Sequence, residues 1–276
     1  MKIAAIEMTT ACDPEVNMPI ISDAVRAAAK AGAQMVALPE TCVFMEKGSK
    51  AMRQRLTSEA DNPHLGALCQ LADELSIWLL IGSMVLADGD SPVNRSLLIS
   101  PEGQVAARYD KIHMFDVTLE NGETHRESAH YKAGEAAVLA PMGAVQLGLS
   151  ICYDVRFPNL YRRLAQAGAH VISVPSAFTH QTGAAHWHIL LRARAIETGC
   201  YIIAPAQVGK HENGRHTYGH SLIIDPWGEI IAEAQHGDRF IMAQIDPATC
   251  AAVRQQLPAL EHGKRFVLPS TDWSHD

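Results

Sequence analysis

Several features that mark other protein classes are missing from this chain of 276 residues. No apolar run approaches the roughly 18 residues that a membrane-spanning helix needs. The formal net charge is -7, and no long run of lysine and arginine appears, which argues against binding to nucleic acid or to an anionic membrane. The first apolar segment is short, is interrupted by Glu7 and has no cleavage site after it, so it resembles a strand more than a signal peptide. We therefore expect a cytoplasmic protein.

Closely spaced cysteine pairs are also missing. None of the six cysteines belongs to a C-x-x-C pair, so neither a zinc ribbon nor a thioredoxin-type site is expected. A chain of this size without a secretory signal is not expected to carry a disulfide framework. Most of these cysteines should be small buried hydrophobic residues.

Motifs for nucleotides, serine nucleophiles and zinc are absent as well. The chain has no G-x-S-x-G, no P-loop, no G-x-G-x-x-G and no H-E-x-x-H. Among its 14 histidines, His186 and His188 are two positions apart, which would direct them to different faces of a helix. We expect no catalytic metal and no cofactor.

The sequence does contain apolar strands that alternate with amphipathic helices. Hydrophobic residues make up 47% of the chain, enough for a substantial core. Apolar runs predict strands, and 3.6-residue periodicity and capping residues predict helices. The expected strands are 2–8, 35–38, 78–86, 145–151, 171–174, 201–204 and 240–245. The expected helices are one around 21–28 and others beginning at or spanning 63, 158–167, 186–198 and 247–256. This alternation predicts a layered α/β fold in one domain over residues 1–276, with about the last 15 residues as a tail.

Two distant hairpins share the pattern S-L-[LI]-I-x-P-x-G-[QE]-[VI]. They lie at residues 96–105 and 221–230, and each has the form strand, Pro-x-Gly turn, strand. Two similar half-structures would explain the repeat, but independent use of the same turn chemistry would explain it equally well.

Three reactive side chains follow expected strands, where α/β proteins place functional groups. Glu40 comes directly after a buried run, and burial would raise its pKa toward that of a proton shuttle. Lys111 follows the first hairpin. Cys152 ends a strand shortly before a helix, as in a nucleophile elbow, where a nearby cation and the helix N-terminus would favour the thiolate. Taken singly, each also has an ordinary explanation: a solvent-facing glutamate, a solvated lysine and an inert buried cysteine.

The segments around these residues resemble the Glu, Lys and Cys motifs of the nitrilase, or carbon–nitrogen hydrolase, superfamily. They occur in the family's order and separation, and the similarity continues along nearly the whole chain. The matching segments are Leu38-Pro39-Glu40, Tyr109-Asp110-Lys111-Ile112-His113, Ile151-Cys152-Tyr153-Asp154-Val155-Arg156-Phe157-Pro158, and further stretches at 175–179, 183–187, 191–197, 218–221 and 225–228.

This resemblance implies a four-layer αββα sandwich of two pseudo-symmetric halves and a homodimer or larger homo-oligomer. It also implies that Cys152 is the nucleophile, Glu40 the general base and Lys111 an oxyanion donor together with the N–H of Tyr153. Glu127 matches the position of a second glutamate that holds the lysine. The implied reaction is amide hydrolysis through a cysteine thioester.

Within the superfamily, the segments 176–179 and 192–197 most resemble the deaminated-glutathione amidase branch. The expected substrate is then deaminated glutathione, which would give α-ketoglutarate and cysteinylglycine. An ω-amidase acting on α-ketoglutaramate, a nitrilase proper and a non-catalytic scaffold stay as alternatives. Tyr153, Phe178 and Trp187 are candidates to line the pocket, although Trp187 fits a core position equally well. Four side chains could bind the substrate carboxylates: Arg192, Arg194, Lys210 and Arg215. The helix arginines fit a structural pairing better, for example with Glu197.

Overall fold

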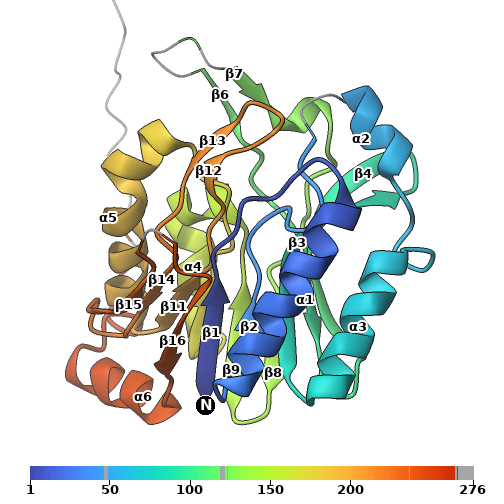
Figure 1. Ribbon diagram of the computed structural model, residues 1–276. Helices are drawn as coiled ribbons and strands as arrows, with labels where there is room; N and C mark the ends of the chain where they lie inside the picture. The colour runs from blue at the N-terminus through green and yellow to red at the C-terminus, as the bar shows by residue number, and fades with distance from the viewer. Residues whose placement is uncertain (47–48, 119–121, 123, 236, 265, 267–276) are drawn as a thin grey trace, which may run out of the picture.

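The computed structural model describes residues 1–46, 49–118, 122, 124–235, 237–264 and 266. Two six-stranded sheets lie face to face (Figure 1), and helices cover their outer sides. The first sheet has the order β16(Phe240–Gln244), β1(Lys2–Ile6), β2(Met35–Ala37), β3(Trp78–Asp88), β4(Ser91–Ile99), β5(Val105–Asp110). The second has the order β15(Ile230–Glu233), β14(Leu222–Ile224), β11(Tyr201–Ala204), β10(Val171–Ser173), β9(Val145–Leu149), β8(Leu139–Met142).

The two sheets repeat one topology, which confirms the predicted pair of similar halves. In each sheet three parallel strands lie side by side, an antiparallel strand flanks the first, and an antiparallel hairpin flanks the third. The hairpins β4–β5 and β14–β15 are the two that share a sequence pattern. Gly103 and Gly228 have φ of 70° and 89° in their turns, a backbone conformation that favours glycine.

Alternation along the strands of the first sheet produces the layers. Ile3 and Leu80 pack with the strands of the second sheet, whereas Ala4 and Leu79 pack with helices α1(Pro14–Lys30) and α3(Pro63–Leu75). Side chains of neighbouring strand residues point to opposite faces, so one apolar strand can serve both layers. The helices α4(Pro158–Gln166) and α5(His180–Thr198) contact strands of the second sheet. The result is the expected αββα sandwich.

Local capping signals agree with the helices that form. The side chain of Asn62 accepts a hydrogen bond from the N–H of Leu65 at 2.8 Å, and Pro63 occupies the first turn of α3. The predicted start of the 186–198 helix was wrong, since α5 begins six residues earlier, at His180. No helix within the described residues is long and apolar enough to cross a membrane.

Several short elements were not predicted. They include α2(Ser49–Arg55), the 3-10 helices η1(Glu127–Ala129) and η2(Cys152–Arg156), and the hairpins β6(Asp116–Thr118)–β7(Thr124–Arg126) and β12(Val208–Lys210)–β13(His216–Tyr218). Both hairpins lie at the same end of the molecule (Figure 1). The C-terminal helix α6(Pro247–Gln256) lies where it was predicted. Most of the expected tail lies outside the described residues.

Candidate active site

Cys152 lies on a tight turn between strand β9 and helix α4. It begins η2, has a φ of 46° and is 7% exposed. A non-glycine residue with positive φ is uncommon and usually held by its surroundings. Here the N–H of Cys152 donates to the carbonyl of Pro175 at 2.9 Å. The next N–H, that of Tyr153, lies in the first turn of η2, where no intrahelical acceptor exists. The strand, turn and helix of the predicted elbow are therefore present, and the N–H of Tyr153 directly follows Cys152 in the turn.

Asp154 holds this turn to the segment that carries Lys111. Its Oδ2 accepts hydrogen bonds from the N–H of Ile151 at 2.8 Å and from the hydroxyl of Tyr109 at 2.7 Å. Its Oδ1 accepts from the N–H of His113 at 3.1 Å and contacts the ring Nδ1 at 2.7 Å. His113 also stacks on Phe157, with ring centroids 3.6 Å apart, so its role is structural. These contacts hold the Cys152 turn and the Lys111 segment against each other.

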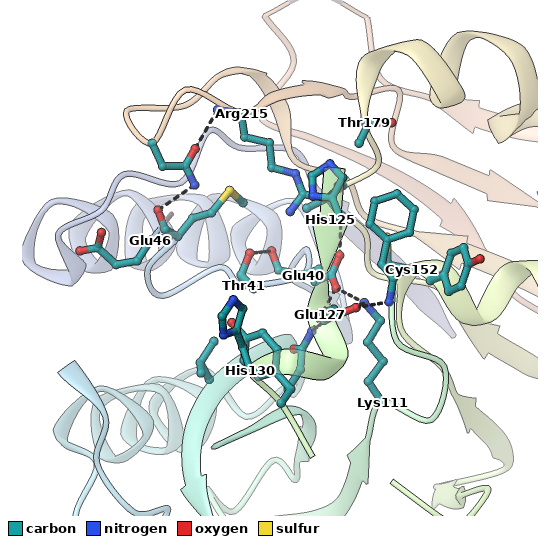
Figure 2. Close-up of a pocket in the computed structure, with 18 of the residues that line it drawn as sticks. Glu40, Thr41, Glu46, Lys111, His125, Glu127, His130, Cys152, Thr179 and Arg215 are labelled. Carbon is teal, nitrogen blue, oxygen red and sulfur yellow. Dashed lines mark hydrogen bonds and ion pairs between the residues drawn. The ribbon is translucent and has the colours of Figure 1, made fainter. Parts of the chain in front are cut away.

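Glu40 follows β2 and is 4% exposed. Its Oε1 accepts hydrogen bonds from Lys111 Nζ at 2.9 Å and from Asn94 Nδ2 at 3.1 Å, while its Oε2 accepts from the N–H of Ala177 at 2.8 Å. The negative charge of this carboxylate also acts on the thiol of Cys152 and raises its pKa. Figure 2 shows Glu40, Lys111 and Glu127 converging beside Cys152. Three residues from distant parts of the chain thus meet at one point.

Close backbone approach at Gly82 makes this convergence possible. Strand β3 passes so near the Glu40 segment and Pro175, whose carbonyl accepts from the N–H of Cys152, that a Cβ at Gly82 would lie 1.9 Å from the carbonyl oxygen of Leu38 and 2.6 Å from Cβ of Pro175. Any side chain there would push both segments apart.

Lys111 connects two carboxylates. Its ammonium group is 2% exposed and lies 2.9 Å from Glu40 Oε1 and 2.9 Å from both carboxylate oxygens of Glu127. Glu127 begins η1, and its Oε2 also accepts from the N–H of Phe115 at 2.6 Å. A buried ammonium needs such partners, because an unpaired buried charge is costly. Glu127 therefore contacts Lys111 as the resemblance implied.

Asn94 is a member of the group that sequence reasoning missed. Its Nδ2 lies 3.1 Å from Glu40 and 3.4 Å from Glu127, so it donates to both carboxylates. The signal was a buried polar residue inside the apolar strand β4, where an amide needs polar partners. Nothing in the sequence indicates which partners these are.

The protonation states follow from these contacts. Burial raises the pKa of Glu40, but the positive charges of Lys111 and Arg215 outweigh it and hold that pKa below its usual value. Burial and the Glu40 carboxylate raise the pKa of Cys152 to about 12. Burial lowers the pKa of Lys111, but the two carboxylates raise it further, to well above its usual value. The resting site therefore holds a thiol, a carboxylate and an ammonium.

Two sequence-based expectations were wrong here. Glu40 was expected to have a raised pKa, because only its burial was considered and not the cations beside it. Cys152 was expected to favour the thiolate, but burial and the adjacent carboxylate dominate over the nearby cations. The first error arose because charge pairing depends on residues far away in the sequence, and the second because burial of the thiol was not set against the nearby cations.

A cavity of about 560 Å³ opens onto this group. Tyr153 and Phe178 line it, as expected. Trp187 does not, because it is fully buried behind Phe178, with ring centroids 5.1 Å apart, and its Nε1 donates to the carbonyl of His220 at 2.8 Å. Of the two roles considered for Trp187, the core role is correct.

Of the four candidate cations, only Arg215 lines the cavity. Arg192 donates to the carbonyl of Gly228 at 2.8 Å, and Arg194 pairs with Glu197 at 2.8 Å, so the structural interpretation of the helix arginines is confirmed. Lys210 is exposed on β12. Further side chains that line the cavity and were not predicted include His125, Arg126, His130 and Tyr131.

Comparison with known proteins decides the family. The family model for carbon-nitrogen hydrolase matches residues 2–255. The chain belongs to the carbon-nitrogen hydrolase family. This membership makes it an enzyme that hydrolyses amide carbon–nitrogen bonds. A deaminated glutathione amidase from Synechocystis sp. is 41% identical over 264 residues, which cover 94% of this chain and 96% of that protein.

Solved structures of the family have the same fold. The C. elegans NitFhit protein has a TM-score of 0.88 and 35% identity, and the match covers 95% of this chain. This chain spans only 65% of that longer protein. A variant of the amidase from Nesterenkonia sp. AN1 has a TM-score of 0.78 and 26% identity, and the match covers 94% of this chain and 98% of that one. In that structure acrylamide has added to the active-site cysteine of the Nesterenkonia enzyme.

Proposed function

We propose that this carbon-nitrogen hydrolase cleaves deaminated glutathione to α-ketoglutarate and cysteinylglycine through a thioester on Cys152. The observation that carries the proposal is the convergence of Glu40, Lys111 and Cys152 at a cavity large enough for a tripeptide-sized ligand. The activity named for the Synechocystis relative supports the choice of substrate.

The geometry supports a two-stage reaction. Glu40 accepts the thiol proton while the sulfur of Cys152 attacks the amide carbon, and Lys111 together with the N–H of Tyr153 stabilises the oxyanion. The carbon–nitrogen bond then breaks, and Glu40 gives its proton to the amine of the departing cysteinylglycine. In the second stage Glu40 removes a proton from water, the resulting hydroxide attacks the thioester, and the carbon–sulfur bond breaks. The sulfur recovers the proton from Glu40, which regenerates the resting thiol.

Glu127 and Asn94 are positioning residues in this scheme. Glu127 contacts Lys111 through both carboxylate oxygens and so keeps the ammonium charged and aimed at the cavity. Asn94 fixes Glu40 and Glu127 relative to each other. Preorganised groups of this kind need not rearrange during the reaction.

The substrate comparison tests the proposal. We expect a higher kcat/KM for deaminated glutathione than for α-ketoglutaramate, with release of α-ketoglutarate as the readout for both. Equal or greater turnover of the smaller compound favours the ω-amidase alternative and contradicts our assignment. A nitrile of the same acid serves as a third substrate, and preference for it would indicate a nitrilase proper.

Arg215 is the residue that we expect to bind a carboxylate of the substrate. It lines the cavity, its Nη2 donates to the carbonyl of Ala177, and its Nε has no partner within the described part of the chain. We expect Arg215→Met to raise KM at least about 10-fold for deaminated glutathione, since a charge-assisted hydrogen bond contributes about 1.5–3 kcal/mol. For an analogue whose carboxylates are amidated, the same substitution should raise KM much less. An equal rise in KM for both compounds would show that Arg215 does not bind the carboxylate.

The pH dependence follows from the charges in the site. Glu40 must be ionised to accept a proton, and its pKa is below the ordinary 4.5, so kcat/KM should fall only below pH 4.5. We expect no change in kcat/KM near the ordinary thiol pKa of about 8.5, because the pKa of Cys152 is raised to about 12. Initial rates between about pH 4 and about pH 9, with folding followed by fluorescence, test this. A rate that rises with a midpoint near 8.5 would instead indicate a preformed thiolate.

We further propose that the enzyme is a cytoplasmic homodimer. Ile189 and Ile196 of α5 and Trp227 of the adjacent hairpin turn are 70%, 54% and 49% exposed, and an apolar group of this kind is typical of a contact between protein chains. All six cysteines are free, which suits a reducing compartment. Sedimentation analysis should give the mass of two chains. The substitution Ile189→Glu should lower this mass toward that of a single chain.

A further inference from the structure

A cluster of three potential metal ligands lies apart from the cavity. It consists of His188 from α5, His220 from the connection between β13 and β14, and Glu233, the last residue of β15. Oε1 of Glu233 lies 3.0 Å from His188 Nε2 and 2.9 Å from His220 Nδ1. All three ligand atoms are within 4.8 Å of one another. None of these residues lines the cavity at Cys152.

The surrounding contacts hold His220 in place. Its backbone has a φ of 56°, and its carbonyl accepts from Nε1 of the buried Trp187 at 2.8 Å. The N–H of the following residue, Ser221, donates to Glu7 Oε2 at 2.7 Å. The ring of Tyr218 stacks on His220 with centroids 4.5 Å apart. The cluster is therefore built on fixed backbone and packed rings, unlike a chance meeting of mobile surface side chains.

We propose that His188, His220 and Glu233 bind one divalent cation of the zinc type. Two imidazole nitrogens and one carboxylate oxygen are a common zinc ligand set, with a water molecule as fourth ligand. Zinc–nitrogen bonds of about 2.0–2.1 Å require ligand atoms about 3.3 Å apart in a tetrahedron, close to the two distances here. Both ring nitrogens already converge on one carboxylate oxygen, so an ion can replace the shared protons after small side-chain rotations.

Such an ion would have no part in the amide chemistry at Cys152, because none of its three ligands lines that cavity. It would link the middle of α5 to β15 and to the β13–β14 connection. Strands β14 and β15 belong to the second sheet, which α5 covers. Helix α5 directly follows residues 177–179, and all three line the cavity. Binding of the ion therefore stabilises the helix whose start shapes the proposed substrate site.

Zinc titration of the full chain tests the proposal. The protein carries Cys152→Ala to remove metal binding by that thiol, and chelator is removed before ZnCl₂ is added in a calorimeter. We expect one tight equivalent of zinc per chain and a melting temperature that rises with zinc. In this background His188→Ala or Glu233→Gln should weaken the site more than about 100-fold, since even partners that only orient metal ligands contribute about 10- to 100-fold.

His64 provides the matched control. Its Nε2 lies 4.0 Å from Glu15 Oε1, and among the described residues no third potential ligand joins this histidine–carboxylate pair. His64→Ala should keep both the zinc affinity and the rise in melting temperature. The proposal is overturned if no tight equivalent is bound, or if His188→Ala and Glu233→Gln bind zinc as well as the parent. These outcomes do not depend on the substrate assignment, because the parent variant lacks the proposed nucleophile.

Discussion

Cys152→Ala should abolish amide hydrolysis and leave the fold intact. The sulfur is the protein atom that bonds to the substrate carbon in the proposed scheme, and loss of a nucleophile in a comparable acyl-transfer site costs on the order of 10⁶ in kcat. Alanine removes one atom from a side chain that is 7% exposed and leaves the contacts of Asp154 in place. Product release measured over long incubations and circular dichroism give the two readouts.

Cys42 is the matched control for this experiment. It is fully buried two residues after Glu40, and burial raises the pKa of its thiol to about 12, as for Cys152. It does not line the cavity, and its thiol donates to the carbonyl of Ser83. Cys42→Ala should therefore retain nearly full activity. Substantial turnover by Cys152→Ala, or equal losses in both variants, would remove the basis for a cysteine nucleophile.

Lys111→Met should lower both activity and stability. Loss of one oxyanion donor costs about 100- to 1000-fold in kcat. The substitution also leaves Glu40 and Glu127 buried without their shared cation, and breaking a buried ion pair from one side costs about 3–5 kcal/mol of unfolding free energy. Urea denaturation at neutral pH measures the second effect. Lys132→Met removes an exposed lysine and should change neither quantity appreciably.

The stability defect of Lys111→Met should depend on pH with a defined sign. In the wild type the lowered pKa of Glu40 contributes stability above its unfolded value of 4.5, and this contribution is lost as pH falls through the folded pKa. Without Lys111, burial should raise the pKa of Glu40, so its carboxyl group destabilises the fold at neutral pH and less so in acid. The difference in unfolding free energy between the variant and the wild type should therefore shrink as pH decreases toward 4.5. A difference independent of pH would mean that packing alone, and not charge, explains the loss.

Much of the fold could be predicted because its signals are local. Apolar runs, the caps at Asn62 and Pro63, and the two Pro-x-Gly turns each depend on neighbouring residues, and all appear in the structure. The start of α5 was misplaced because His180 to Ala185 carry no strong apolar periodicity. The hairpin β6–β7 was missed because its two short strands are mostly polar and exposed, so neither forms an apolar run.

The arrangement of the site could be predicted only by resemblance to a family. Spacing along the chain does not show that Lys111 lies between two carboxylates or that Asn94 joins them. The same limit explains the errors in the pKa directions of Glu40 and Cys152, since each is set by partners more than 40 positions away. Trp187 could not be assigned because an amphipathic aromatic residue suits a core and a pocket equally well.

The most direct test of the account is acid quenching of the wild-type enzyme during turnover of deaminated glutathione, followed by peptide mass spectrometry. We expect an α-ketoglutaryl group on the peptide that contains Cys152, sensitive to hydroxylamine as a thioester is. The group should be absent from Cys152→Ala. Steady turnover with no acyl group on that peptide, or with the group on another residue, would contradict the central claim.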